Sequence, residues 1–230
     1  MFCLNNIFVV SIGGSSIIRE KPEAELIQKI CNSIEKLSSE GYKFALVVGG
    51  GKTAGDYVNA ARELGANNFV LDEIGIHVTR LNARLVIQSL ERAHREVLTE
   101  LKHSREIIAE GKIPVFGGMI PGYTTDSVSA LLAEYLHATF INLSNVKGVF
   151  TADPKLDSKA KFLEKTSYDE ILSILSKTEN KPRQHKILDI PAALILKRSK
   201  IKSVILDAKD LLNFENSVRG KKFEGTTIEA

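Results

Sequence analysis

The sequence has few cysteines, no block of like charge, no internal repeat and no apolar run long enough to cross a bilayer. Cys3 and Cys31 lack CxxC spacing and a neighbouring histidine cluster, which excludes a recognisable zinc site or disulfide framework and favours a reducing compartment. The formal net charge is only +3, with both signs interspersed. This balance argues against a nucleic-acid partner.

The apolar segment at 7–12 is too short to span a membrane and has no basic leader or small-residue cleavage site, so we expect a buried strand. The sequence therefore predicts a cytoplasmic protein with no membrane partner. With 230 residues, 43% of them hydrophobic, the chain is long enough to bury one substantial core. We expect a single domain over 1–230.

Short apolar runs alternate with segments of helical periodicity along the chain. The predicted strands are 7–12, 44–48, 113–116, 139–143, 203–206 and the closing 225–229. The predicted helices are 26–37, 53–64, a long or broken helix over 74–101, 126–136, 167–175 and 190–198. This alternation predicts an α/β fold, a three-layer αβα sandwich around a largely parallel central sheet.

Glycine turns follow three of the predicted strands, at 13–15, 49–51 and 117–118. Ligands of open α/β sheets gather at the carboxyl ends of strands, and glycine lets backbone amides approach phosphate closely. The GGGKT run is not a complete P-loop, because its first glycine would have to stand at Leu46, and no GxGxxG follows the early strands. The turns indicate phosphate binding by another loop arrangement.

Six sequence blocks carry a family resemblance: SIGGSSI, VVGGGKTA, LDEIGIHVTRLNA, PVFGGMIPGYTTDSVSALLAE, NVKGVFTADP and the closing GTTIE. In this order and spacing they resemble the amino-acid kinase superfamily and, within it, archaeal uridylate kinases. The resemblance implies the amino-acid kinase fold, with an acceptor-binding lobe over about 1–138 and an ATP-binding lobe over about 139–230. It also implies a homo-oligomer, a hexamer built from dimers, that acts in pyrimidine biosynthesis.

The activity that the resemblance implies is transfer of the terminal phosphoryl group of ATP to uridine monophosphate (UMP), by direct in-line attack with Mg²⁺ as cofactor. Such a reaction depends on alignment and charge neutralisation rather than on covalent chemistry by the protein. The resemblance assigns Asp126 to ordering the basic groups around the transferred phosphoryl, and Lys52 is the candidate catalytic cation. No protein-held metal site is expected.

The remaining site residues are assigned by position. The ATP site takes Gly13, Gly14, Ser15, Gly51, Gly55, Ser144, Asn145, Phe150 and Asp153. The UMP site takes Gly50, Asp72, Met119, Ile120, Pro121, Gly122, Tyr123, Thr124 and Thr125.

Several site positions depart from the family pattern. Ser11 and Leu194 stand where many relatives have lysine, and Gly55 stands where arginine is usual. Met119 and Ile120 replace a polar pair, and Lys147 replaces an aspartate. Four cations are candidates to neutralise phosphate instead: Lys52, Arg80, Lys147 and Lys197. The departures leave open a nucleotide- or anion-binding protein without transferase activity, and a kinase for another small acceptor.

Some of these residues also have purely structural interpretations. Asp72 could cap a helix that begins near Ile74, and Arg80 could form a surface ion pair with Glu73 or Asp72. Thr125 and Asp126 are ordinary first-turn residues of a helix. Lys52 could be a solvated lysine at a helix start. The charged stretch 177–186 is expected to be a surface loop without a binding role.

Overall fold

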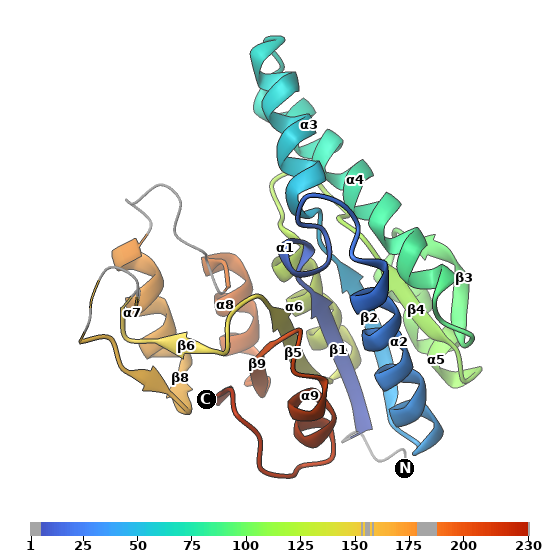
Figure 1. Cartoon of the computed structure of the whole chain (residues 1–230), viewed down its shortest axis with the longest axis vertical. Coiled ribbons are helices and arrows are strands. Elements are labelled where there is room, and N and C mark those ends of the chain that lie inside the picture. The colour runs from blue at the N-terminus through green and yellow to red at the C-terminus, as the bar shows by residue number, and fades with distance from the viewer. Residues whose placement is uncertain (1–5, 153, 155–156, 158, 179–187, 230) are drawn as a thin grey trace.

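The computed structural model describes residues 6–152, 154, 157, 159–178 and 188–229 (Figure 1). Eight strands form one sheet in the order β3-β4-β2-β1-β5-β9-β10-β8, and every neighbouring pair is parallel except β9 and β10. The strands are β1 (Ile7–Ile12), β2 (Lys43–Val48), β3 (Ala93–Leu98), β4 (Ile113–Phe116), β5 (Thr139–Ser144), β8 (Lys165–Ser167), β9 (Ser203–Asp207) and β10 (Thr226–Glu229). A separate antiparallel pair is formed by β6 (Val149–Phe150) and β7 (Phe162–Leu163).

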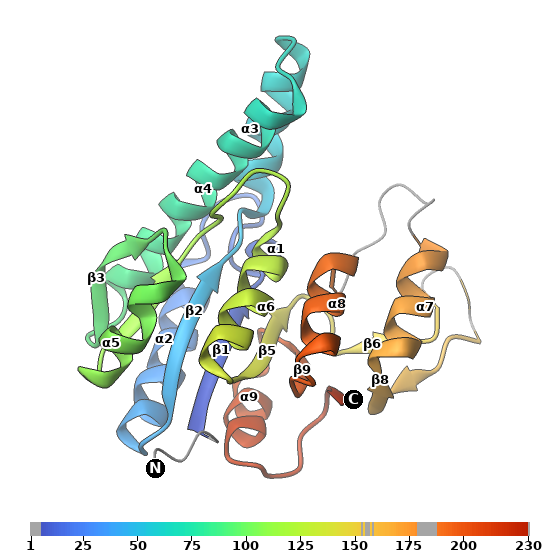
Figure 2. The ribbon, with the colours of Figure 1, turned by 180° about the vertical axis from the view of Figure 1, so that it is seen from behind.

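Helices cover both faces of the sheet (Figures 1 and 2). The helices are α1 (Gly14–Ile17), α2 (Ala24–Ser39), α3 (Gly51–Glu63), α4 (Asn68–Gln88), the 3₁₀ turn η2 (Leu101–His103), α5 (Ser104–Ala109), α6 (Thr125–Leu136), α7 (Tyr168–Thr178), α8 (Ile190–Arg198) and α9 (Leu211–Val218). One core joins the sheet to α2, α4 and α9, and the other joins it to α5, α6, α7 and α8. The predicted three-layer architecture is confirmed.

The central strands separate these two cores by simple alternation of side chains. In β1, Phe8, Val10 and Ile12 pack into the first core, whereas Val9 packs into the second. Successive side chains of a strand point to opposite faces, so a continuous apolar run buries both sides of a parallel sheet. Ser11 follows the same alternation and faces α6.

Helices α3 and α4 form a hairpin that projects well beyond the sheet (Figures 1 and 2). The base of α4 packs against β2, β3 and β4, while its N-terminal part pairs with α3. No residue of α3 is fully buried. Within the described residues, no helix is both long and apolar enough to cross a membrane.

The predicted helix over 74–101 is wrong in its second half. Helix α4 ends at Gln88, and 93–98 forms the edge strand β3, which pairs in parallel with β4 across an irregular register. An edge strand exposed on one side buries few side chains, so AHREVL carries no clear alternation for sequence reasoning to detect. Helices α1, α5 and α9, the turn η2 and strands β6, β7 and β8 were also not predicted. The charged stretch falls largely on 179–187, outside the described residues.

Candidate functional site

The three glycine turns and the start of the SNVKG segment meet at one edge of the sheet. Strands β4, β2, β1, β5 and β9 are consecutive neighbours and all parallel, so their carboxyl ends lie side by side. Gly117 follows β4, Gly49 follows β2, Gly13 follows β1 and Asn145 follows β5. The structure therefore brings together segments that are far apart in the sequence, at the edge where open α/β sheets bind ligands.

The first two turns pack backbone against backbone. A Cβ atom on Gly14 would lie 2.2 Å from the Gly51 nitrogen, and one on Gly49 would lie 2.5 Å from the Gly14 nitrogen. Gly51 also has a φ of +61°, which favours glycine. Glycine is therefore required at these positions, because a side chain would clash with the backbone of the other turn. The turns open α1 and α3, and the amides in the first turn of a helix have no partner within it. The Lys52 amide of α3 donates instead to the Ile18 carbonyl oxygen at 3.2 Å, so the amides of Gly14, Ser15 and Gly51 are the candidates for binding an anion.

Two buried polar residues of α4 hold the glycine turns in place. The Asn82 side-chain amide donates to the Gly49 and Gly50 carbonyl oxygens at 2.9 and 3.0 Å. The Thr79 hydroxyl accepts from the Gly118 amide at 2.6 Å. Sequence reasoning gave neither residue a role. The sequence did contain an indication of their role, because two polar side chains three positions apart on a buried helix face need hydrogen-bond partners.

The 119–125 loop is held by α4 at two points. Asp72 accepts a 2.8 Å hydrogen bond from the Gly122 amide, and Arg80 donates to the carbonyl oxygens of Gly118 and Met119 at 3.1 and 3.5 Å. Asp72 lies inside α4, which begins at Asn68 with Asn67 as its cap, so the interpretation of Asp72 as a helix cap is wrong. The alternative pairing of Arg80 with Glu73 or Asp72 is also replaced by these loop contacts.

The loop's own side chains are mostly accessible. Met119 packs against the second core, whereas Ile120 is 57% exposed. Pro121 is half-buried, and Gly122 has a φ of +86°. Tyr123 is exposed, and the Thr124 hydroxyl caps α6 by accepting from the Ser127 amide. Thr125 is the first residue of α6. The accessible face is therefore partly apolar.

Asp126 projects from the first turn of α6 toward β1. Its carboxylate accepts a 3.2 Å hydrogen bond from the Ser11 hydroxyl. The residue as a whole keeps some solvent exposure, but its carboxyl group is enclosed by protein. Burial and the neighbouring Asp189 charge raise the pKa of Asp126 to about 7, although the Ser11 hydrogen bond opposes this. Asp126 therefore changes charge near neutral pH.

Asp189 is a second carboxylate at this position that sequence reasoning did not identify. It caps α8 by accepting from the Ala192 amide at 2.6 Å. It also accepts from the hydroxyls of Thr124 and Ser127, the latter at 3.0 Å. The sequence signal was an aspartate three residues before an alanine at a predicted helix start, which indicates only a cap.

The predicted ATP-side residues lie on and beyond β5. Ser144 ends β5, Asn145 is exposed, and the Phe150 ring packs edge-on against Phe162 with centroids 5.2 Å apart. Ser15 lies exposed in α1, next to Gly14. Asp153 falls outside the described residues.

Of the three positions that lack the usual basic side chain, Gly55 and Leu194 are open, whereas Ser11 is buried in β1. Nothing lies within 4 Å of a Cβ on Gly55, and Leu194 is 49% exposed on α8. Three of the four candidate cations form ion pairs with exposed partners: Lys52 with Asp56, Lys147 with Glu224, and Lys197 with Asp169. Pairs of this kind contribute little stability, so a phosphate could displace the carboxylate at small cost.

Comparison with known proteins places these features in a family. The Amino acid kinase family model matches residues 6–207. A uridylate kinase of Pyrococcus abyssi is 44% identical over 96% of this chain and 98% of its own length. One from Thermococcus kodakarensis is 40% identical with the same coverage. The chain belongs to the amino acid kinase family.

Solved structures agree with this membership. The crystal structure of uridylate kinase from Archaeoglobus fulgidus superposes with a TM-score of 0.85 and 38% identity, over 96% of this chain and 99% of that one. An aspartate kinase from Synechocystis, at 20% identity, shares the fold with a TM-score of 0.76 over 40% of its own chain. The predicted fold family is therefore confirmed.

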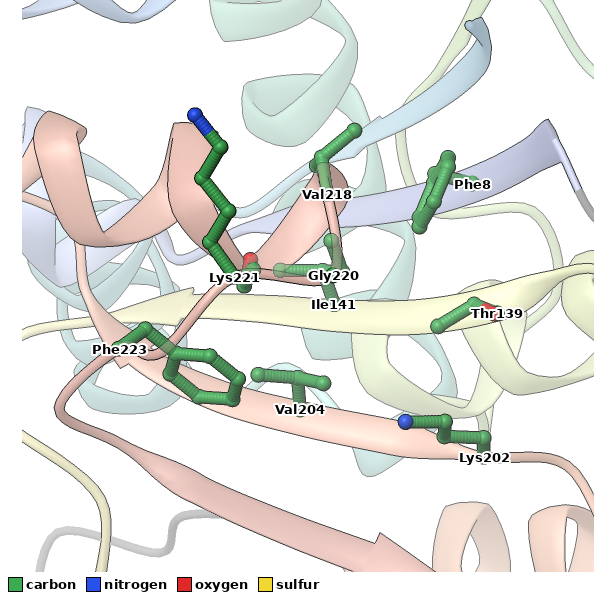
Figure 3. Close-up of a pocket in the computed structure, with 10 residues that line it drawn as sticks. Phe8, Thr139, Ile141, Lys202, Val204, Val218, Gly220, Lys221 and Phe223 are labelled. Atoms are coloured by element: carbon green, nitrogen blue, oxygen red, sulfur yellow. The ribbon is translucent and has the colours of Figure 1, made fainter.

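A cavity of about 240 Å³ lies at the opposite edge of the sheet in this member of the family (Figure 3). It is lined by the amino ends of β1, β5 and β9 and by the loop after α9, including Phe8, Lys202 and Phe223. It contains none of the predicted site residues. Among the described residues, no group of three or more histidine, cysteine or acidic side chains is placed to hold a metal ion.

Proposed function

We propose that the chain is a uridylate kinase that transfers the terminal phosphoryl group of ATP to UMP. The observation that carries the proposal is the meeting of three glycine turns and Asp126 at one edge of a parallel sheet. The near-full-length similarity to uridylate kinases supports it.

The proposed ATP site uses the turn at Gly13 and the amides of Gly14 and Ser15, because the Gly13 amide itself donates to the Leu143 carbonyl oxygen at 2.9 Å. Gly51, Gly55 and the segment from Ser144 through Asn145 and Phe150 to Asp153 complete the proposed site. The proposed boundary between acceptor and donor lobes lies near residue 138, between α6 and β5. The proposed UMP residues follow β2 and β4, and most of the proposed ATP residues follow β1 and β5. Because β2 and β5 flank β1 in the sheet, β1 lies between the two proposed ligands.

The proposed UMP site uses Gly50, Asp72 and the 119–125 loop. Asp72 would receive the ribose hydroxyls, and its present bond to the Gly122 amide keeps the carboxylate beside the loop. The apolar Ile120 and the accessible part of Met119, which otherwise packs against the second core, would face the base or ribose. The hydroxyls of Thr124 and Thr125 lie at the start of α6, where helix amides favour an anion.

In the proposed reaction, an oxygen of the UMP phosphate attacks the terminal phosphorus of ATP. The bond from that phosphorus to the bridging oxygen breaks, which gives UDP and ADP. Backbone amides at the glycine turns and the Lys52 ammonium neutralise the charge that develops. Asp126, as a carboxylate, would order the basic groups around the transferred phosphoryl and would not act as a base.

Magnesium enters this scheme as part of the substrate MgATP. Mg²⁺ in kinases is held largely by phosphate oxygens and water, with at most one or two carboxylates, so a protein cage is not required. The bound ion would neutralise donor phosphate charge.

We also propose a homo-oligomer, a hexamer by family resemblance, with the α3–α4 hairpin covered by another copy. The hairpin exposes several large apolar side chains, among them Tyr57, Leu64, Phe69 and Leu81. Apolar patches of this kind mark interaction surfaces. Leu81→Glu should lower the mass measured by light scattering, whereas Leu212→Glu, at an exposed apolar site on α9, should not. An unchanged mass for Leu81→Glu contradicts this interface.

A cytoplasmic location follows from the proposed substrates, and the free, buried Cys31 is consistent with a reducing compartment.

The decisive experiment is a coupled assay with ATP, Mg²⁺ and a panel of nucleoside monophosphates. UMP should give the highest kcat/KM. No UMP turnover at high enzyme concentration would reject the proposal. Tight ATP binding without turnover of any acceptor would instead establish a binding protein, the alternative that the open Gly55 and Leu194 positions favour.

A further inference from the structure

One carboxylate connects the amino ends of two neighbouring helices. Asp189 accepts from the Ala192 amide in α8, from the hydroxyl of Thr124, which caps α6, and from the Ser127 hydroxyl within α6. Ser127 is completely buried, and its hydroxyl donates to both oxygens of this carboxylate at 3.0 Å. The contact therefore joins the end of the 119–125 loop to α8.

The same two helices are also joined at their other ends. Arg198 near the end of α8 donates to both carboxylate oxygens of Glu134 in α6, at 2.8 and 2.5 Å. Figure 2 shows α6 and α8 packed along one another. The far contact can hold the helices together, but the Asp189 contact is the one that hydrogen-bonds to the end of the loop and acts on the charge of Asp126.

Two neighbours set the charge state of Asp126 besides its burial. The Ser11 hydroxyl of β1 favours the carboxylate and lowers the pKa, and the Asp189 charge of α8 raises it. Asp189 therefore has two separable effects, a set of hydrogen bonds and a charge.

We propose that Asp189 is a positioning residue that fixes the 119–125 loop and Asp126 relative to α8, and so aligns the acceptor with the donor lobe. This inference rests on the proposed function for its kinetic readout. Asp189 contacts no reacting atom in this scheme and acts through Thr124, Ser127 and Asp126.

Two substitutions separate the two effects. Asp189→Asn keeps an oxygen that can cap α8 and accept from a hydroxyl, but removes the charge. Its KM for UMP should stay within about threefold of wild type, because the loop remains held. The acid limb of its kcat/KM profile should move down by about one pH unit, because loss of a like charge lowers the Asp126 pKa.

Asp189→Ala removes the hydrogen bonds as well. Its KM for UMP should rise about tenfold while the KM for ATP changes less than about threefold, because the loop end loses its fixed position. Ser127→Ala should raise the UMP KM in the same direction by a smaller factor, although Ser127 is not among the proposed ligand contacts.

Two controls distinguish positioning from general stability. Asp210→Ala removes the equivalent cap of α9, where Asp210 accepts from the Asn213 amide, and Glu134→Gln weakens the far contact of α6 with α8. Both should lower Tm and leave the UMP KM and the acid limb unchanged. If Asp189→Asn does not move the acid limb, or Asp189→Ala lowers Tm without raising the UMP KM, the inference is overturned.

A measurement of UMP binding tests the role of Asp189 separately from the proposed kinase activity. If wild type binds UMP by calorimetry but does not turn it over, the proposed function fails. The positioning role then predicts a Kd for UMP about tenfold weaker in Asp189→Ala than in Asp210→Ala. Equal Kd values in those two variants, or no UMP binding by wild type, would refute it.

Discussion

Asp126→Asn should stabilise the folded protein at alkaline pH while it reduces activity. The wild-type carboxyl is enclosed by protein beside Asp189, and its pKa is raised from 3.8 to about 7. Above pH 7 the folded state must hold a charge that would be better solvated in the unfolded chain. Asparagine has a similar shape, carries no charge and keeps an oxygen that can accept from the Ser11 hydroxyl.

The magnitude follows from the pKa change. A rise of about three pKa units at about 1.4 kcal/mol per unit sets an upper value of about 4 kcal/mol. We expect a gain of about 2–4 kcal/mol in the free energy of unfolding at pH 8, and a Tm increase of roughly 5–12 °C. Because the Asp126 pKa is raised in the folded state, the charged carboxylate destabilises the folded protein by the full amount above about pH 7. The destabilisation shrinks between about pH 7 and pH 4 and is absent below about pH 4. The gain at pH 5 should therefore be less than half of that at pH 8.

The assay is urea and thermal unfolding of both proteins at pH 8 and pH 5, with kcat measured at pH 8. Activity should fall by about 100-fold, the size expected for loss of a charged group that organises the transition state. Asp169→Asn, an exposed acid paired with Lys197, should change stability little at either pH. An Asp126→Asn variant that is equally destabilised at both pH values would refute the burial argument.

The other predictions concern the glycine turns and the cations around them. Gly14→Ala should weaken ATP and UMP binding more than tenfold in calorimetry, because its Cβ would lie 2.2 Å from a backbone nitrogen. Gly55→Ala, whose Cβ would lie in open space, should stabilise α3 by up to about 1 kcal/mol in thermal unfolding. Asn82→Ala should cost about 1–3 kcal/mol in urea unfolding and raise both KM values, because two turn carbonyls lose their donor; unchanged KM values would contradict the role. Lys52→Ala should lower kcat about tenfold or more. Lys197→Ala should leave kcat and the ATP KM within about twofold; equal effects of the two lysine variants would contradict Lys52 as the catalytic cation.

The sequence predicts best what depends on local pattern. Runs such as 7–12 and 139–143 are buried on both faces and strongly apolar, and both became central strands. The glycine turns after 7–12, 44–48 and 113–116 were equally visible, because the close backbone contacts at these turns leave no room for a Cβ atom. Strand β3 has one neighbouring strand and little burial, so nothing in AHREVL separates it from the end of a helix.

The sequence predicted site residues in two cases only: where a glycine turn offers its backbone amides, and where the residue lies in one of the six sequence blocks that resemble the family. Asn82 and Thr79 hold turns that precede or follow them by more than thirty residues, and such pairing is decided by the packing of α4 on the sheet. Asp189 is similar, because its local sequence indicates a helix cap and nothing about Thr124 or Ser127. These contacts depend on the adjacency of α6 and α8, which no local pattern contains.

The position of the 119–125 loop follows from these distant contacts rather than from its own residues. Asp72 and Arg80 hold it from α4, and Asp189 holds its end from α8. The side chain of Ile120 is exposed to solvent and does not hold the loop in position. Substitutions in α4 or α8 should therefore change how well any acceptor is aligned, whereas substitution of Ile120 should change which acceptor is preferred. Because the first effect alters kcat/KM for every nucleoside monophosphate and the second alters their ratio, one substrate panel run on both kinds of variant separates alignment from selectivity.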